Sequence, residues 1–465
     1  MLDSDILERL RSALGPAHVR VDAEALSTYG ADALKRGFPP DVVVWPGTTE
    51  EVVAIARICH ESETPLVPRG AGTGYTGGAV PIHGGVVVSL ERLNRILEID
   101  ESNLLAVVEP NVVTGDLQDA VERVGLFYPP DPASLRESVI GGNVAECAGG
   151  PRAFKYGVTR QYVLGLEAVL PTGDVIRTGG RTVKNVVGYD VTQLLVGSEG
   201  TLAILTKVIL RLIPRPPAQA TLRATFVTVA DAMRAVSNLL RARVVPATLE
   251  FVDGACLRAV AEHTGGHALA PSGTGALLLI EVDGLAEQVQ AEAAGVARAC
   301  REAGSTELLS ATGETERSEL WRVRRELSSS LRKIEPLKFN HDVVVPKSRV
   351  PELLSQVEAL GRKYEMKIPC FGHVGDGNIH VNIMIPDEEA ARRRVDAAEH
   401  ELFEGVVALG GSISGEHGIG FAKARFLGME LTPETIAVMK RIKRAFDPKG
   451  ILNPGKIFPP ETGED

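Results

Sequence analysis

The chain has 465 residues, with 50 Lys and Arg against 60 Asp and Glu, and a formal net charge of −10. This length exceeds one ordinary hydrophobic core, so we expect two domains. The acidic balance argues against a nucleic-acid-binding protein, and no run of about 18 apolar residues predicts a transmembrane segment. The first residues, MLDSDILERL, do not fit a signal peptide, so we expect a cytoplasmic protein with at most peripheral contact with the inner membrane.

The five cysteines are scattered and form no C-x-x-C pair. They fit a reducing compartment and argue against a disulfide framework, a structural zinc site and an iron–sulfur cluster.

Strand and helix signals alternate at the start of the chain. Residues 42–45 read as a strand, and Thr48 with Glu51 forms a capping box that opens a helix running to Cys59. Residues 65–67 read as a second strand. This order predicts a small βαβ unit.

A glycine-rich stretch, GAGTGYTGG, follows that second strand, and its Gly72, Gly74 and Gly77 match the dinucleotide pattern G-x-G-x-x-G. That pattern requires a helix after the glycines, whereas here AVPIHGG and then the strand-like VVVSL follow. The stretch therefore joins two strands. With Arg69 at its entrance it fits an anion cradle, and a flexible turn stays open as the alternative.

Further along, residues 104–109 read as a strand and 115–124 as a helix, and two more glycine-rich loops are expected at 141–150 and 197–200. Clustered prolines at 214–217 mark a boundary. Beyond it the pattern is α+β, with helices expected at 229–241, 286–302 and 351–364 and strands at 276–282 and 342–345.

Several motifs in order resemble a known family. PRGAGTGYTGG, YPPDPAS, IGGNVAECAGG, KYG, VKNVVGYD and GSEGTLAI resemble the PCMH-type FAD-binding domain of the vanillyl-alcohol-oxidase flavoproteins. GHVGDGNIH, SGEHGIG and FDPKGILNPGKI are similar to the group that contains the FAD-linked subunit of glycolate oxidase and D-lactate dehydrogenase. The resemblance implies an α+β fold: a two-subdomain FAD-binding domain at 1–215, a cap domain with an antiparallel sheet at 216–425, and a segment at 426–465 that returns to the FAD domain.

The resemblance also implies which residues hold FAD. The diphosphate set is Arg69, Gly70, Gly72, Thr73, Gly74, Gly77 and Gly78; the ribityl and flavin set is Pro132, Ser134, Gly141, Asn143 and Gly149; Glu199 and Ile204 fall near the adenosine half. Some relatives tether the flavin through a histidine in the first loop. Tyr75 and Thr76 stand in that neighbourhood here, so we expect non-covalent FAD. Cys147 and the lead-in PRAF at 151–154 depart from the family pattern.

The motif GHVGDGNIHVN predicts a tight turn that folds His373 back toward a strand on which His380 and Asn382 share a face. Two histidines with a carboxylate, for which Glu416 is the candidate, suit a divalent metal, and hydrogen-bonded turn histidines are the alternative. The resemblance favours zinc, manganese or iron on His373, His380 and Glu416.

Three further residues complete the expected site. His417 is the candidate general base, and Arg324 matches the arginine that relatives use on the substrate carboxylate. Lys338 is a weaker second cation, whereas Arg322 and Arg325 read as solvated.

The expected activity is FAD-dependent oxidation of a small D-2-hydroxy acid, glycolate or D-lactate, to the 2-oxo acid, by metal-assisted hydride transfer to flavin N5. Reoxidation would need an acceptor protein, a quinone, partner oxidase subunits or oxygen, and a homo-oligomer also fits. Two alternatives stay open: the FAD subunit of a glycolate oxidase that is inactive alone, and a flavin-dependent transferase of the same fold. The sequence leaves the substrate, the metal and the acceptor undecided.

Overall fold

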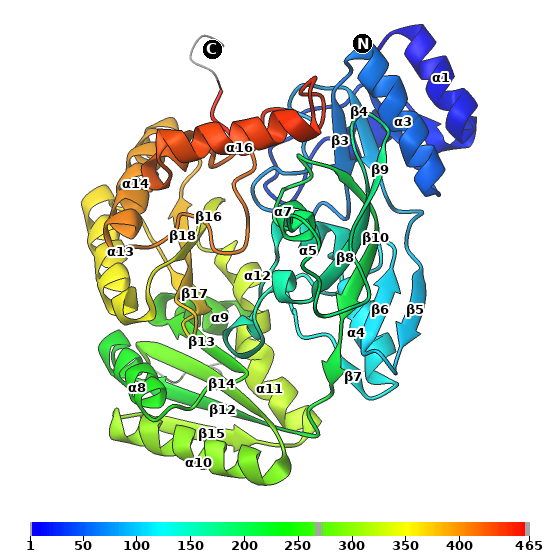
Figure 1. The fold of residues 1–465 in the computed structure, drawn as a ribbon. Helices are drawn as coiled ribbons and strands as arrows, with labels where there is room; N and C mark the ends of the chain where they lie inside the picture. Colours follow the sequence, from blue (N-terminus) through cyan, green and yellow to red (C-terminus); the bar gives the residue numbers. More distant parts are fainter. Residues whose placement is uncertain (1, 266–270, 272, 461–465) are drawn as a thin grey trace. The chain divides into compact units, whose positions relative to one another are not determined.

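The chain divides into two units, each assembled from segments that are far apart in the sequence (Figure 1). Unit 1 comprises Met1–Gly149, Val158–Arg215 and Glu416–Asp465, and unit 2 comprises Gly150–Gly157 and Pro216–Gly415. The computed structural model describes residues 2–265, 271 and 273–460. Within these ranges, no helix is both long and apolar enough to cross a membrane.

A four-stranded sheet forms the first half of unit 1, in the order β1 (Val19–Arg20), β2 (Val42–Val44), β4 (Val86–Ser89) and β3 (Leu66–Arg69). β4 runs parallel to both β2 and β3, so the glycine stretch joins two strands as predicted. Thr48 caps helix α3 (Thr49–Ser62) by accepting from the Glu51 amide. Helices α1 (Ser4–Leu14) and α3 share one core with the valines of this sheet.

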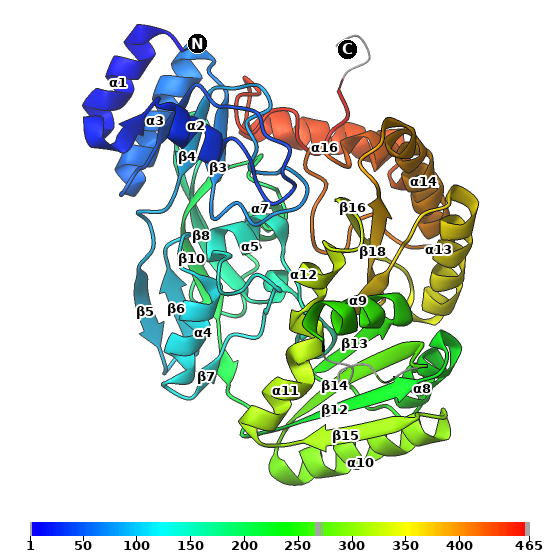
Figure 2. The same cartoon turned by 180° about the vertical axis from the view of Figure 1, so that it is seen from behind.

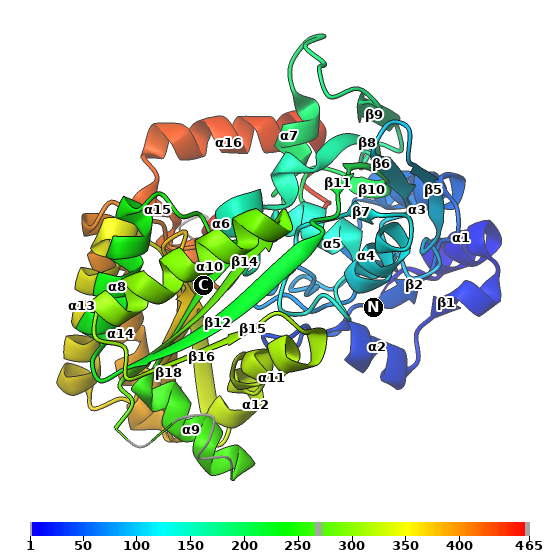
Figure 3. The same ribbon diagram turned by 90° about the horizontal axis from the view of Figure 1, so that it is seen from below.

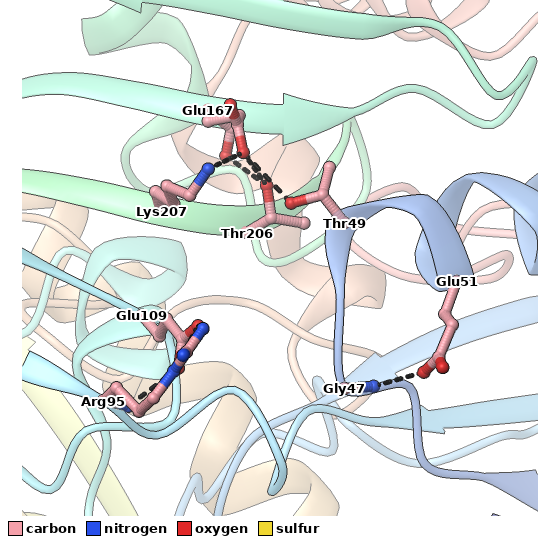
Figure 4. Close-up of polar contacts among 8 residues, drawn as sticks. All are labelled: Gly47, Thr49, Glu51, Arg95, Glu109, Glu167, Thr206 and Lys207. Carbon is pink, nitrogen blue, oxygen red and sulfur yellow. Dashed lines mark hydrogen bonds and ion pairs between the residues drawn. The ribbon is translucent and has the colours of Figure 1, made fainter. Parts of the chain in front are cut away.

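An antiparallel five-stranded sheet forms the second half, in the order β5 (Ile96–Asp100), β6 (Leu105–Val108), β10 (Ile204–Arg211), β8 (Val163–Val169) and β9 (Val175–Gly179). Glu167 of β8 accepts hydrogen bonds from Lys207 and from Thr49 at the start of α3 (Figure 4). Burial alone would raise the pKa of Glu167, but its cationic and hydroxyl partners lower the pKa to about 2. This carboxylate therefore joins the second sheet to helix α3, which packs on the first sheet.

The glycine-rich segment at 141–150 was expected as a loop, and this prediction was wrong. Residues Ile140–Glu146 form helix α5, which ends at Cys147 in the left-handed conformation. A Cβ on Gly141 would lie 2.6 Å from the Cβ of Pro110, so this glycine permits close packing of the helix rather than a turn.

The end of the chain completes unit 1. Helix α16 (Pro433–Phe446) leads to Ile451, whose carbonyl accepts from the Leu66 amide at 2.8 Å, and the Asn453 amide donates to the Leu66 carbonyl at 2.7 Å. Leu452 therefore lies beside β3 as an added parallel bridge. Ile451 and Leu452 are buried in the same core as α1 and α3.

Unit 2 is built on a seven-stranded antiparallel sheet, which confirms the expected α+β class. Its order is β15 (Glu307–Ala311), β12 (Ala218–Phe226), β14 (Ala276–Gly284), β13 (Thr248–Asp253), β17 (Cys370–His373), β18 (Asn378–Ile385) and β16 (Leu337–Val344). Helices α9 (Gly254–Thr264), α11 (Glu314–Arg325) and α12 (Leu327–Leu331) cover one face. Helices α8 (Val229–Arg241) and α10 (Ala286–Glu302) lie on the other (Figures 2 and 3).

Residues Gly150–Gly157 interrupt unit 1 and belong to unit 2 because Asp283 at the end of β14 anchors them. The Lys155 Nζ donates to the Asp283 carbonyl at 2.7 Å, and the Tyr156 hydroxyl donates to Asp283 Oδ2 at 2.8 Å. The KYG motif is thus attached to the large sheet.

Candidate active site

One face of the unit 2 sheet carries a row of polar side chains. Residues directly opposite each other in antiparallel strands point to the same face. The register pairs His373 with Glu250, His380 with Asp342, Asn382 with Asn340, and Met384 with Lys338. His373 and His380 are 3% and 5% exposed. Because side chains alternate between the two faces of a strand, His373, His380 and Lys338 lie on the same face of the sheet.

The two histidines face each other across a hairpin. β17 ends at His373, and β18 begins at Asn378, two residues earlier than expected. Gly377 has φ +91, and its Cβ would lie 2.1 Å from the Val345 carbonyl, so only glycine suits this turn. The imidazole centroids are 5.2 Å apart with planes at 85°.

Glu416 follows directly on Gly415, whose amide donates to Asp342 Oδ2 at 2.9 Å. Asp342 is the residue paired with His380 in the sheet register. Its hydrogen bond therefore holds Gly415, the residue before Glu416, near this histidine. One ligand atom from each of His373, His380 and Glu416 lies within 4.8 Å of the other two. A divalent ion with histidine and carboxylate ligands fits such a set.

A buried carboxylate lies behind each histidine. His373 Nδ1 is hydrogen-bonded to Glu250, and His380 Nδ1 lies 3.8 Å from Asp342 Oδ1. Burial alone would raise the pKa of Glu250, but His373 and Arg324 lower it to about 2. The hydrogen bond to Glu250 fixes the His373 imidazole so that its Nε2 is the ligand atom, which is the usual support of a metal-binding histidine, whereas the 3.8 Å separation at His380 is too long for a hydrogen bond.

Arg324 projects from α11 toward the same carboxylate. Its Nε donates to Glu250 Oε2 at 2.6 Å, and its guanidinium lies 4.7 Å from the centroid of the Phe371 ring. Among the described residues, Nη1 and Nη2 of Arg324 have no hydrogen-bond partner. Arg322 and Arg325 instead contact Glu319 and Ser318 of their own helix. The Nη1 and Nη2 groups of Arg324 are therefore available to donate a pair of hydrogen bonds to an anion.

Lys338 lies on β16 opposite Met384. Burial lowers the pKa of Lys338 to about 8, and its ammonium has no hydrogen-bond or ion-pair partner in the part of the chain that the structure describes. An anionic ligand would stabilise the charged form.

His417 belongs to unit 1 and is held by the glycine stretch. Thr76 Oγ1 donates to the His417 carbonyl at 3.1 Å, and the Tyr75 ring lies 5.4 Å from the imidazole. The Phe421 amide donates to the Thr76 carbonyl at 3.1 Å. The stretch expected to bind the cofactor thus also positions the candidate base.

The glycine stretch itself fits an anion cradle. In the described structure, the amides of residues 71–76 donate no hydrogen bond, so a run of N–H groups is left for a ligand. A Cβ on Gly74 would meet nothing within 4 Å, whereas one on Gly72 would lie 2.3 Å from Arg69. Arg69 is buried, and burial lowers its pKa. These features fit a diphosphate.

The other expected cofactor residues lie close to this stretch in unit 1. A Cβ on Gly70 would lie 2.6 Å from Val139, and one on Gly78 would lie 2.8 Å from Glu146 Oε1. These contacts bring α5 and its preceding turn against the glycines. Thr73 lies within the cradle. Pro132 and Ser134 form the turn before Val139, and their carbonyls accept hydrogen bonds from the amides of residues 135, 137 and 138. Gly141 and Asn143 lie in α5, and Gly149 follows this helix.

Asn143, Glu199 and Ile204 use their side chains within the protein. The Asn143 Nδ2 donates to Thr114 at 2.6 Å, and Ile204 is fully buried in the core. Glu199 accepts from the amides of Ile419 and Gly420 at 2.8 and 2.6 Å. Glu199 therefore supports the segment that follows His417.

Replacing Gly77 by alanine is expected to abolish flavin loading. Gly77 has φ +78, which costs an L residue about 1–2 kcal/mol, and a Cβ there would lie 2.0 Å from the Phe421 ring. The flavin-to-protein absorbance ratio and the Tm both test this. Gly74→Ala is the matched control: it should keep the Tm of the flavin-free protein and lower only FAD affinity, because its Cβ meets open space. A fully flavin-loaded Gly77→Ala variant with wild-type Tm would contradict the expectation.

One carboxylate beside the glycine stretch, that of Glu146, was not anticipated. Burial, and then the charges of Glu199 and Asp32, raise the pKa of Glu146 well above its ordinary value. Glu146 Oε2 is buried without a hydrogen-bond partner among the described residues. The only sign of this carboxylate in the sequence was the presence of an acidic residue inside the glycine-rich motif IGGNVAE.

Because the folded-state pKa of Glu146 is raised, its contribution to stability is complete below the unfolded pKa near 4.5 and is lost as the pH rises through the folded value. Glu146→Gln should therefore gain several degrees in Tm over wild type at pH 8 and little at pH 5. Thermal unfolding at the two pH values measures this, with the exposed Glu137→Gln as control. An equal effect at both pH values would show that the carboxyl does not titrate as described.

Family models match both halves of the chain: residues 40–179 match the FAD binding domain, and residues 215–457 match the C-terminal domain of FAD linked oxidases. The chain belongs to the FAD-linked oxidase family. It is 42% identical over 463 residues to "Glycolate oxidase subunit GlcD" of Bacillus subtilis, covering 98% of this chain and 97% of the relative. It is 35% identical to "D-lactate dehydrogenase" of Anaerostipes hadrus, with 97% of each chain covered.

Membership in this oxidase family makes the chain an FAD-dependent oxidoreductase. Among solved structures, p-cresol methylhydroxylase with substrate bound shares the fold, with a TM-score of 0.83, 20% identity, and coverage of 99% of this chain and 97% of that one. The motif VKNVVGYD lies in an exposed loop after β9, where Tyr189 is 99% exposed (Figure 3).

Proposed function

We propose that this chain is a dehydrogenase of small D-2-hydroxy acids that binds FAD non-covalently and uses a divalent metal. The observation that carries the proposal is the pair of buried histidines, of which His373 is hydrogen-bonded to Glu250, beside the open fork of Arg324. The names of relatives support it, because glycolate, D-lactate and D-2-hydroxyglutarate, named in a relative from Stutzerimonas stutzeri, are all 2-hydroxy acids. We favour glycolate or D-lactate.

In this proposal the substrate carboxylate binds to Arg324, with Lys338 as a second cation. A guanidinium fork suits a carboxylate because two parallel hydrogen bonds form at once. His417 accepts the proton of the 2-hydroxyl group. Bound FAD would supply the hydride acceptor, N5, and the glycine stretch with Arg69 would hold its diphosphate.

Free energies explain why a metal would accompany His417. A hydroxyl with a pKa near that of water, about 15.7, lies roughly nine units above an ordinary histidine, a gap of about 12 kcal/mol. His373, His380 and Glu416 would hold the ion, whose Lewis acidity would remove most of this gap. The buried histidines and their supporting carboxylates would keep the ligand atoms in place.

The name of the Bacillus subtilis relative also supports a second form of the proposal, in which this chain works as one subunit of a larger glycolate oxidase. Electrons would then pass to a partner subunit. Activity of the isolated chain with an artificial acceptor would separate the two forms.

The test is an anaerobic visible spectrum of the purified protein before and after addition of glycolate, D-lactate, L-lactate or D-2-hydroxyglutarate, with and without chelator. We expect glycolate or D-lactate to bleach the flavin and L-lactate to leave it oxidised, and we expect chelation to prevent bleaching and added metal to restore it. Bleaching that survives chelation would remove the metal from the proposal. A yellow protein that no 2-hydroxy acid bleaches would overturn the dehydrogenase assignment.

A further inference from the structure

Glu250 is a fully buried carboxylate in the middle of the unit 2 sheet, at 0% exposure. It lies on β13, directly opposite His373 on β17. One oxygen, Oε1, is hydrogen-bonded to His373 Nδ1, and the other, Oε2, accepts from Arg324 Nε. A single side chain therefore contacts both a candidate metal ligand and the candidate carboxylate anchor.

Burying an acid at this depth is costly unless both oxygens are paired. Here the two partners come from different elements: His373 from the sheet and Arg324 from α11. Because the imidazole and the guanidinium share one acceptor group, movement or loss of charge at either partner alters the hydrogen bond to the other.

We propose that Glu250 is a positioning residue that couples metal binding to recognition of the substrate carboxylate. Glu250 holds His373 so that Nε2 of the imidazole is available to the ion. Because Arg324 uses its Nε to bind Glu250, its Nη1 and Nη2 remain available for the substrate carboxylate. This inference rests on the proposed function and adds to it that the metal and the anion bind cooperatively through one buried group.

Glutamine at this position distinguishes coupling from packing. It has nearly the same shape, but it offers one acceptor oxygen and one donor nitrogen, so it can serve only one of the two partners. Glu250→Gln should therefore weaken metal binding about 10–100-fold and raise KM for the 2-hydroxy acid in the same variant. Glu250→Asp keeps the charge and both acceptors, so it should retain more metal affinity than Glu250→Gln.

Glu281 supplies a matched control. It lies on the neighbouring strand β14 on the same face, is 5% exposed, and accepts from Thr221 at 2.7 Å with Arg317 of α11 at 3.5 Å. Glu281→Gln removes an equivalent buried charge away from the histidines. A purely structural effect would lower the Tm of both variants, whereas coupling moves metal affinity and KM only in Glu250→Gln.

The experiment uses flavin-loaded protein stripped of metal, with Zn²⁺ and Mn²⁺ affinities measured by competition with a chelator, and KM and kcat measured separately. A wild-type protein that binds neither ion refutes the metal in the proposed function. A wild-type protein that binds metal, together with a Glu250→Gln variant of unchanged metal affinity and KM, overturns the inference alone.

If Glu250→Gln does not fold, Arg324→Ala tests the same coupling with Glu250 intact. Without Arg324, Glu250 is hydrogen-bonded to His373 alone, so metal affinity should rise about fivefold. Arg322 lies two residues before Arg324 on the same helix and forms an ion pair with Glu319, so Arg322→Ala should leave the metal affinity unchanged. Equal affinities in wild type and Arg324→Ala would overturn the coupling.

Discussion

If the proposed metal is present, replacing His380 by alanine is expected to abolish its binding and to lower kcat/KM about 1,000-fold. The imidazole is buried on the face that also carries His373, and it would be one of three ligands. The ion would supply Lewis acidity worth several kcal/mol in the transition state, and a loss of about 4 kcal/mol corresponds to a factor of 1,000. Metal content of the purified variant and its steady-state kinetics measure both effects.

His341→Ala is the control for this substitution. His341 is also a buried histidine in unit 2, but it pairs in register with Val381 rather than His380, so it points to the other face of the sheet. Its Nε2 lies 3.1 Å from Glu399. This variant should keep its metal even if it loses stability. Metal retained at wild-type levels in His380→Ala would show that the histidine pair is structural.

Replacing His417 by alanine is expected to lower kcat by about 100- to 10,000-fold while flavin and metal content stay unchanged, because a positioned general base contributes about this much. The main chain of His417 is held through its carbonyl by Thr76, so truncation of the side chain should leave the segment in place. Spectra, metal analysis and kinetics between pH 5 and 9 test these three expectations.

The exposed His83→Ala in the same unit is the matched control and should retain wild-type kcat. A His417→Ala variant that keeps wild-type kcat would move the proton acceptor to another group.

Local patterns predicted the elements that carry the site. The alternation in GHVGDGNIHVN put His380 and Asn382 on one face, and the structure confirms this register. The glycine stretch was expected to join strands, since AVPIHGG cannot continue a helix, and β3 and β4 confirm it. Such features depend on neighbours within a few residues, so the sequence alone determines them.

Features that depend on distant contacts escaped prediction. Glycines at 141 and 142 suggested a loop, but packing against Pro110 makes the segment a helix. Glu250 reads as one acid in an apolar strand, TLEFVD, and its importance comes from a histidine 123 residues later. Glu199 was assigned to the cofactor by resemblance, whereas its carboxylate accepts from amides more than 200 residues away. Propensity carries no information about such pairings.

The order in which the chain is made sets the order in which it can fold. Leu452 and Ile451 cover the open edge of β3 and share the core with α1 and α3, so unit 1 is incomplete until these two residues have been synthesised. Unit 2 lies almost entirely within Pro216–Gly415 and emerges whole before that point. The residues of α1 and α3 thus emerge from the ribosome well before Ile451 and Leu452, with which they share a core. A fragment ending at Arg215 would keep an uncovered strand edge and an unfilled core, which favours aggregation.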